Sequence, residues 1–395
     1  MDSKKLNKNI FKNLIVITHC DHTISSSDKI QAYTPYVREI NMWCELFENV
    51  IIYGPTSKRT LNTSIEEFKY DNIKLKTIFF SNSSNKTDFL NILFNYFLKF
   101  FRFIQLPIIF LQLLPIISST NVIHLRSPSY PAFISSILIK IFNKKSIIKY
   151  AGGFHSFPKE NFISKIQRLL LLDYMKKSKV LVYDKVNRSN FITFFPALYS
   201  KYEIEKFRDL KIANNSVKQF LCVGRLNIDK GFDLVIEAFG LIKKNNPKLN
   251  WNLTFVGDGE YKTTLKRFVK QNNIEDKVFF KGALSFTKTL EKYSNSDALI
   301  MPGVKEGWPK TIAEAWVTKT FVISANRGNC ERIIGDNSGV LFEPNKLSLY
   351  NVILNFLNRV YDTDSYILNG LEKSKNLTLE SYKLNLKKNI IELYG

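Results

Sequence analysis

Short runs of apolar residues alternate with longer amphipathic stretches along almost the whole chain. Six runs in the first half have the length of a β-strand: 14–18, 50–53, 75–80, 122–125, 146–150 and 180–183. Between the first two, apolar residues recur at helical spacing, and Pro35 suits the first turn of that helix. Alternating strands and helices predict an α/β fold with parallel sheets.

The same alternation starts again in the second half. Its expected strands lie at 220–223, 253–256, 278–280, 298–301, 321–324 and 340–342. Two such series favour two Rossmann-like domains over one long sheet. We expect an N-terminal domain over 1–200 and a C-terminal domain over 216–375, joined by the weakly patterned stretch 196–216.

The segment 103–125 contains no charged residue. A membrane-spanning helix needs about 20 apolar residues, but Gln105, Pro107, Gln112 and Pro115 interrupt this run. We therefore expect it to be buried in the first domain or to dock shallowly on a membrane, rather than to cross one.

The composition is that of a globular protein, with 45% hydrophobic and 23% charged residues in 395. Its four cysteines lie far apart, which argues against a disulfide scaffold or a zinc finger and favours a reducing compartment. The basic stretch 4–12 precedes only four apolar residues, too few for a secretory signal. We expect a cytoplasmic protein, either free or peripheral on the cytoplasmic face of the membrane.

The charge is the unusual feature: 57 Lys and Arg against 35 Asp and Glu give a net charge of +22. Eight basic residues and no acidic one lie between Asp88 and Glu160. This field suits a nucleic acid, a phosphorylated substrate or an anionic membrane, although a general bias toward lysine would produce it as well. Most aromatic residues occupy core-like positions instead of alternating with lysine, so we expect no nucleic-acid partner.

All four histidines fall in the first half, each at or just beyond the end of an expected strand: His19, His22, His124 and His155. Ligands of open α/β sheets bind at the carboxyl ends of the strands. The histidines are therefore candidate site residues on the evidence of position alone.

The second half carries a more specific pattern in the segment 224–231, which follows a strand and opens a helix. Gly224 permits close approach of the backbone to a ligand, and Arg225 and Lys230 bring two positive charges. A helix N-terminus adds amide groups and a favourable dipole. The segment predicts a diphosphate site.

A second junction of loop and helix lies at 302–315. Pro309 suits the first helical position, so that amides of 308–311 would face a ligand. Glu306 precedes this helix and Glu314 lies inside it. One carboxylate can then accept hydrogen bonds from a sugar and the other from ribose hydroxyls.

Glu306 and Glu314 form an E-x7-E motif, and the surrounding EGWPKTIAEA resembles the EGFP-x-x-x-x-EA signature of the family-4 retaining glycosyltransferases with the GT-B fold. The segments VGRLNIDKGFDLVIEAF, FVGDGEY, FFKGAL and FVISANRGNCERIIGDNSGVLF resemble that family in the same order, over 218–343. The first domain matches less well, because 22–29 lacks the glycines that often follow the first strand. Residues 34–39 and 126–129 look like the subset linked to synthesis of surface polysaccharides.

The resemblance implies two Rossmann-like domains facing each other across a cleft, with a final helix over 379–394 that packs back on the first domain. It implies that these residues bind the donor: Gly224, Arg225, Lys230, Gly257, Gly282, Gly307, Trp308, Pro309, Lys310, Thr311 and Glu314. It assigns sugar contacts to Glu306, and a place near the anomeric centre to either His124 or His155. On the acceptor side we expect His19, Arg126, Gly152 and Gly153.

The family further implies catalysis without an obligatory metal or other cofactor. Asp362, Thr363 and Asp364 resemble a metal-binding DxD, but they follow the Rossmann pattern, and we interpret them as a turn or helix cap. We therefore expect a retaining hexosyltransferase that moves a sugar from a nucleotide-diphosphate sugar to a glycan or lipid-linked glycan of a bacterial surface polysaccharide (capsule, O-antigen or lipopolysaccharide). The alternatives are a nucleotide-sugar epimerase of the same fold and, less favoured, a nucleic-acid-binding module.

Overall fold

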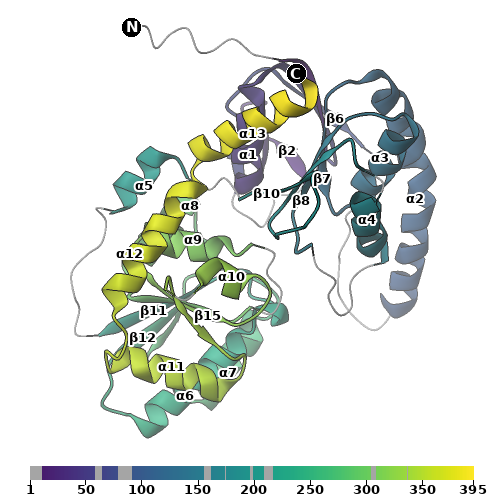
Figure 1. Cartoon of the computed structure of the whole chain (residues 1–395). Coiled ribbons are helices and arrows are strands. Elements are labelled where there is room, and N and C mark those ends of the chain that lie inside the picture. The colour runs from purple at the N-terminus through teal and green to yellow at the C-terminus, as the bar shows by residue number, and fades with distance from the viewer. Residues whose placement is uncertain are drawn as a thin grey trace, which may run out of the picture. The chain divides into compact units, whose positions relative to one another are not determined.

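A computed structural model describes residues 11–57, 65–78, 91–154, 162–173, 175–195, 199–208, 217–303, 308–335 and 337–395, with only the backbone for 91–104 and 207–208 (Figure 1). The chain divides into two compact units. Unit 1 comprises residues 1–197 and 382–395, and unit 2 comprises residues 198–381. The chain thus enters unit 2 once and returns to unit 1 for its last helix.

Unit 1 is built on a parallel seven-stranded sheet in the order β10-β9-β8-β7-β1-β4-β6. Its strands are β1 (Phe11–Ile17), β4 (Phe47–Gly54), β6 (Ile73–Thr77), β7 (Ile123–Ser127), β8 (Ile147–Tyr150), β9 (Lys179–Val182) and β10 (Phe191–Thr193). All six strands expected from the sequence are present, and β10 adds a seventh. A small antiparallel sheet of β2 (His22–Ile24), β3 (Ile30–Tyr33) and β5 (Ile65–Glu67) lies outside that expectation, because polar residues interrupt these short strands and leave no apolar run.

Helices cover both faces of this sheet. On one face lie α2 (Asn91–Ser119), α3 (Tyr130–Ile141) and α4 (Phe162–Asp173), which pack on the inward residues of β1, β7, β8 and β9. The other face carries α1 (Thr34–Cys44) and the unit 1 part of α13 (Leu379–Tyr394). Successive residues of β7 and β8 point to opposite faces of the sheet, so that they contact different helices.

The uncharged segment 103–125 forms the second half of α2 and leads into β7. Ile109, Leu113 and Ile117 are fully buried against unit 1, so the expectation of burial in the first domain is confirmed for one face of the helix. Among the residues whose positions are described, no helix has the length and apolar character needed to cross a bilayer.

Unit 2 holds a parallel six-stranded sheet in the order β13-β12-β11-β14-β15-β16. Its strands are β11 (Lys218–Val223), β12 (Trp251–Val256), β13 (Val278–Phe280), β14 (Ala298–Met301), β15 (Phe321–Ala325) and β16 (Val340–Phe342), which confirms all six expected strands. This is the 3-2-1-4-5-6 order of the Rossmann fold, whose ligand crevice lies where the order reverses. In unit 2 that point falls between β11 and β14.

The helices of unit 2 alternate with its strands as expected, except that α5 precedes β11 and α12 follows α11. They are α5 (Lys201–Arg208), α6 (Phe232–Asn245), α7 (Lys262–Gln271), α8 (Phe286–Ser294), α9 (Lys310–Val317), α10 (Cys330–Ile334), α11 (Lys346–Leu357) and α12 (Thr363–Ser374), with short 3₁₀ turns at Ile228–Lys230 and Lys375–Leu377. Asp362 is the N-cap of α12, and its side chain accepts a hydrogen bond from the amide of Ser365 at 3.3 Å. The interpretation of Asp362–Asp364 as a helix cap is confirmed.

Candidate functional site

Three glycines predicted to bind the donor lie together at the carboxyl ends of β11, β12 and β13. The amide of Gly224 donates to the carbonyl of Val256 at 3.0 Å, and the amide of Gly257 donates to the carbonyl of Gly282 at 2.8 Å. A Cβ on Gly257 would lie 1.9 Å from the carbonyl oxygen of Gly224, and the φ of Gly257 is +138°. Only glycine fits there, and the absent side chains leave backbone exposed at the strand ends.

Two of the three predicted cations of unit 2, Arg225 and Lys230, belong to the loop after β11, and the third, Lys310, begins α9. The alkyl chain of Lys230 lies over Gly224, with its Cε 3.6 Å from where a Cβ on that glycine would be. Arg225 is exposed. Gly231, at φ +61°, ends this loop against the carbonyl of Pro302, so the loops after β11 and β14 meet at the reversal of strand order. The two positive charges therefore lie at the place where such sheets bind ligands.

The second predicted junction begins one residue later than expected. Helix α9 starts at Lys310, and Pro309 is its N-cap instead of its first helical residue. The ψ of Pro309 is 99°, which is an extended and not a helical value. Pro309 therefore precedes the helix instead of forming its first residue. Trp308 is buried, and the hydroxyl of Thr311 contacts the sulfur of Met301 at 3.3 Å, which attaches the helix to β14.

Glu314 lies on the second turn of α9 and is half-buried. The hydroxyl of Tyr293, a fully buried residue of α8, donates to its Oε2 at 2.8 Å. Burial raises the pKa of Glu314, whereas the Tyr293 hydroxyl and the charge of Lys310 act to lower that pKa. Tyr293 was not predicted, and no sequence signal connects it with Glu314, since the contact depends on how α8 and α9 pack.

Glu306, Gly307 and His155 lie outside the described residues. Their proximity to Glu314, Lys230 or the strand ends of unit 1 therefore stays a prediction.

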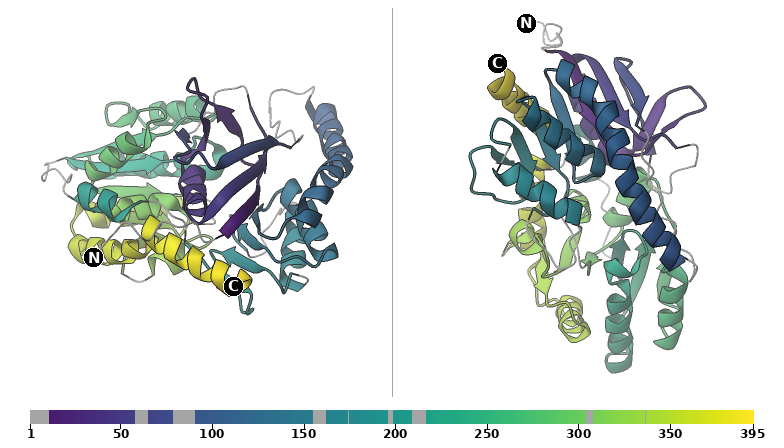
Figure 2. Two further views of the ribbon diagram at one scale, coloured as in Figure 1. Left: turned by 90° about the horizontal axis from the view of Figure 1, so that it is seen from above. Right: turned by 90° about the vertical axis from the view of Figure 1, so that its right-hand side faces the viewer.

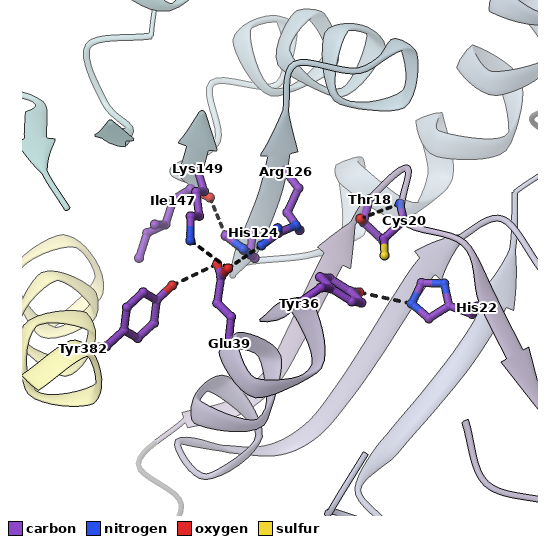
Figure 3. Close-up of polar contacts among 10 residues, drawn as sticks. All are labelled: Thr18, Cys20, His22, Tyr36, Glu39, His124, Arg126, Ile147, Lys149 and Tyr382. Atoms are coloured by element: carbon purple, nitrogen blue, oxygen red, sulfur yellow. Dashed lines mark hydrogen bonds and ion pairs between the residues drawn. The ribbon is translucent and has the colours of Figure 1, made fainter. Parts of the chain in front are cut away.

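Unit 1 contains a buried ionic cluster that the sequence did not reveal (Figure 3). Glu39 of α1 is its centre: Oε2 lies 2.7 Å from both the Lys149 amine and an Arg126 guanidinium nitrogen, and Oε1 accepts a hydrogen bond from the Tyr382 hydroxyl at 2.9 Å. Burial alone would raise the pKa of Glu39, but Arg126 and Lys149 outweigh it and hold that pKa well below its usual range. The carboxylate is therefore ionised, and it attaches α1 and α13 to β7 and β8.

Arg126 is accordingly turned toward Glu39, and its guanidinium lies 4.8 Å from the centre of the Tyr36 ring. We predicted Arg126 to line a ligand site, but its charge is already paired inside unit 1.

The position predicted for His124 is wrong. It is the second residue of β7, because the strand continues to Ser127, and its side chain points to the face covered by α1. The ring is fully buried, stacks on Trp43 at 4.3 Å between ring centres, and donates from Nδ1 to the carbonyl of Ile147 at 3.0 Å. Burial lowers the pKa of His124 to about 3. This neutral ring presents no surface to a substrate.

His22 is also enclosed. It lies in β2 and contacts the hydroxyl of Tyr36 and the carbonyl of Pro55, each at 3.2 Å. Burial lowers its pKa to about 4. Its ring therefore supports the packing of β2 on α1.

The other predicted residues of unit 1 do lie at strand ends. His19 follows β1 and is half-buried, and Gly152 and Gly153 follow β8. Because β7 alone separates β1 from β8, these strand ends are close neighbours. Burial and then the charge of Arg126 lower the pKa of His19 to about 4, so its ring is neutral at pH 7. A Cβ on Gly153 would meet no atom within 4 Å, so open space lies beside it.

A cavity of about 620 Å³ lies elsewhere in unit 1, between the start of β1 and the end of α2. None of the predicted site residues lines it. In the described part of the chain, no three His, Cys, Asp or Glu side chains are grouped so that they could hold a metal ion.

The family model described as "Glycosyl transferases group 1" matches residues 203–359. Protein CapJ of Staphylococcus aureus is 25% identical over 301 residues, which cover 70% of this chain and 75% of that protein. The alpha-monoglucosyldiacylglycerol synthase of Streptococcus pneumoniae is 25% identical over 264 residues, covering 66% and 58%. A Campylobacter jejuni enzyme named N-acetylgalactosamine-N,N'-diacetylbacillosaminyl-diphospho-undecaprenol 4-alpha-N-acetylgalactosaminyltransferase is 24% identical, covering 61% and 68%.

Solved structures match over nearly the whole length of the chain. A glycosyltransferase from Rickettsia africae gives a TM-score of 0.67 at 16% identity, covering 98% of this chain and 100% of that one. Anabaena HepE in complex with UDP and glucose gives a TM-score of 0.65 at 13% identity, covering 96% and 99%. The fold of both units is thus present in these solved structures.

Proposed function

We propose that this chain, a glycosyltransferase with the GT-B fold, moves a hexose from a nucleotide-diphosphate sugar to a glycan or lipid-linked glycan acceptor with retention of anomeric configuration. The supporting observation is the edge of unit 2 where Gly224, Gly257 and Gly282 adjoin Arg225 and Lys230. Bare backbone beside two cations is suited to a diphosphate. The UDP in the HepE structure is consistent with such a donor.

The two ends of the donor would be held by different groups. Arg225 and Lys230 would bind the diphosphate and neutralise the charge that develops on it as the sugar leaves. Glu314 would accept hydrogen bonds from the ribose through Oε1, since Oε2 already accepts one from Tyr293. Glu306 would contact hydroxyls of the sugar. With this charge supplied by side chains, we propose that turnover needs no metal ion.

On the acceptor side, His19, Gly152 and Gly153 are the candidates that lie at neighbouring strand ends. Of the two histidines considered for the anomeric centre, we propose His155, because the ring of His124 is enclosed in unit 1. The diphospho-undecaprenol in the name of the Campylobacter jejuni transferase favours a lipid-linked acceptor, and we propose one that is used in a bacterial surface polysaccharide. A lipid-linked acceptor would place the enzyme on the cytoplasmic face of the membrane.

We propose a front-face reaction. The bond between the anomeric carbon and the leaving phosphate oxygen breaks, the acceptor hydroxyl bonds to the same face of that carbon, and its proton passes to the leaving phosphate. No carboxylate among the described residues suggests itself as a glycosyl nucleophile. Trapping a sugar covalently on a protein carboxylate would contradict this mechanism.

The function can be tested with purified protein and a panel of UDP-, GDP-, dTDP- and ADP-sugars in buffer containing EDTA. We expect one donor to bind and to be slowly hydrolysed, and Arg225→Ala to reduce kcat/KM about 100-fold through loss of a charged hydrogen bond. Glu306→Ala should impair turnover as well. Arg267→Ala on α7 is a matched control, since this exposed arginine belongs to no proposed site.

The outcomes separate the alternatives. Conversion of a nucleotide sugar to its epimer, without release of nucleotide, would favour the epimerase. Absence of binding to every donor would contradict a transferase of this type.

A further inference from the structure

Arg327 lies in the turn between β15 and α10, at the carboxyl edge of the unit 2 sheet. Its amide donates to the carbonyl of Ala325 at 2.9 Å, and its own carbonyl accepts from the amide of Cys330 at 3.2 Å. The next residue, Gly328, has a φ of +58°, which turns the chain into the helix. These backbone contacts hold Arg327 directly at the end of its strand.

The guanidinium of Arg327 is half-buried, and among the residues that the structure describes it forms no ion pair and no hydrogen bond. Two acids are near it along the chain or across to β16. Glu343 instead accepts a hydrogen bond from the side chain of Asn326 at 3.3 Å, and Glu331 is exposed on α10 without pairing with Arg327. The positive charge therefore has no counter-ion in the described part of unit 2.

Two half-buried arginines of unit 1 show the usual arrangement. Arg38 lies 3.1 Å from a carboxylate oxygen of Glu66, and Arg126 lies 2.7 Å from one of Glu39. Taking a charge out of water without a partner costs free energy, and a counter-ion offsets that cost. A bound anion would supply for Arg327 what the glutamates supply for the other two arginines.

Arg327 shares its edge of the sheet with the proposed diphosphate site but lies on a different strand. The strands β12, β11, β14 and β15 lie side by side in this order, the first two in teal green and the last two in lighter green (Figure 2). They are parallel, so the loops that follow them share the carboxyl edge. Neighbouring strands are about 4.8 Å apart, which puts the ends of β11 and β15 about 10 Å from each other. Arg327 therefore lies beyond the diphosphate site, on the far side of β14.

A nucleotide sugar carries its nucleoside at one end of the diphosphate and its sugar at the other. On the proposed diphosphate site beside Arg225 and Lys230, the edge continues in one direction over Gly257 and Gly282, where bare backbone suits the flat face of a base. In the other direction it continues over β14 to Arg327. With the nucleoside over the glycines, the sugar extends toward Arg327.

We propose that Arg327 binds the C6 carboxylate of a hexuronic acid, so that the donor is a nucleotide-diphosphate uronic acid. A neutral hexose offers no charge to a guanidinium, whereas a carboxylate can accept two parallel hydrogen bonds from it. The diphosphate is the other anion of the donor, but Arg225 and Lys230 already lie at its proposed site, two strands from Arg327. The assignment rests on the proposed transferase reaction and specifies the sugar class of its donor.

The test uses three pairs of donors that differ only at C6: UDP-glucuronate with UDP-glucose, UDP-galacturonate with UDP-galactose, and GDP-mannuronate with GDP-mannose. Titration calorimetry on the full chain measures the dissociation constant of each donor without an acceptor. We expect the uronate of one pair to bind at least about tenfold more tightly than its neutral partner, since it gains a charged hydrogen bond. If no uronate binds more tightly than its neutral partner, the proposal is overturned.

Variants connect this preference with the guanidinium. Arg327→Ala should weaken binding of the preferred uronate at least about tenfold and leave binding of its neutral partner and of the free nucleoside diphosphate unchanged. Arg327→Lys keeps the charge without the planar fork and should recover part of the loss. Arg332→Ala removes the same charge from an exposed position on α10 and should change none of the three affinities. Arg225→Ala should weaken all three, because the diphosphate is common to them.

Two results would overturn the role of Arg327 even if a uronate is preferred. Loss of affinity for the free nucleoside diphosphate in Arg327→Ala, as in Arg225→Ala, would assign the guanidinium to the diphosphate. Equal losses for the uronate and its neutral partner would show that the residue acts only through the structure of the loop.

The same measurements separate this proposal from the proposed function. Binding and slow hydrolysis of a neutral donor, without preference for any uronate, would overturn the assignment to a uronic acid and leave the transferase intact. Absence of binding to every donor would contradict the transferase, and the assignment of Arg327 would be overturned with it.

Discussion

At the scale of single residues, the carboxylate of Glu314 depends on the hydroxyl of Tyr293. Burial favours the protonated form of Glu314, and the hydrogen bond from Tyr293 opposes it at 2.8 Å. A protonated Glu314 carboxyl group would be a poorer acceptor of hydrogen bonds from the ribose hydroxyls. The hydroxyl thus orients the carboxylate and opposes its protonation.

Tyr293→Phe should therefore raise the pKa of Glu314 and move the acidic limb of kcat/KM for the donor to higher pH. Hydrogen bonds to charged groups contribute about 1.5–3 kcal/mol, so a displacement of about one to two pH units is expected. Tyr350→Phe is the control, because that hydroxyl pairs with Asn246 and not with a carboxylate. An unshifted limb in Tyr293→Phe would refute this role.

At the scale of elements, the loops at the strand ends of unit 2 pack backbone against backbone at glycines, because a side chain at these positions would keep the loops apart. The loops after β11 and β12 meet at Gly224 and Gly257, and those after β11 and β14 meet at Gly231 and Pro302. The sequence marks these positions only as glycines near strand ends. Which loops touch follows from the order of the strands.

Two alanine substitutions separate backbone strain from steric clash at this edge. Gly282→Ala introduces a side chain at φ +71° into open space and should destabilise unit 2 by about 1 kcal/mol. Gly257→Ala adds a clash with the carbonyl of Gly224 and should cost about 3 kcal/mol or more. Urea unfolding followed by tryptophan fluorescence measures both changes in the free energy of unfolding. Equal costs would show that the backbone shifts to relieve the clash.

At the scale of the whole molecule, the chain folds back so that its last helix completes the first unit. Tyr382 bonds Glu39 across 343 residues of sequence, and the same carboxylate holds Arg126 and Lys149. Two buried cations thus share one anion. Breaking a buried ion pair by removal of one partner costs about 3–5 kcal/mol, since the remaining charge stays uncompensated.

Glu39→Gln should therefore destabilise unit 1 by about that amount, and Tyr382→Phe by about 1.5–3 kcal/mol. The folded pKa of Glu39 is depressed, so its contribution is present above the pKa of the unfolded chain, near pH 4.3, and is lost as the pH falls below it. Hydrogen exchange of α1 and α13 measures these changes from pH 7 to 3. Tyr70→Phe, which breaks a less buried bond to Glu45, should have the smaller effect.

The sequence by itself determined the α/β class, all twelve expected strands and the position of the glycine-bearing loop after β11, because apolar periodicity and glycines at strand ends are local signals. It also identified Asp362 as a cap, since capping depends on adjacent residues. It missed β2, β3, β5 and β10, because these short strands contain polar residues and form no apolar run, unlike the equally short β13 and β16. The site roles carried over from the family stay predictions.

Only the tertiary structure decided which side chains meet. It enclosed His124, turned Arg126 toward Glu39 and joined Tyr293 to Glu314. The strand β7 extends past its apolar run, so residues expected at its end lie within it and face α1. Contacts between α8 and α9, or between α1 and α13, cannot be recognised in the local pattern of apolar and polar residues. They arise when helices distant in sequence pack on one sheet.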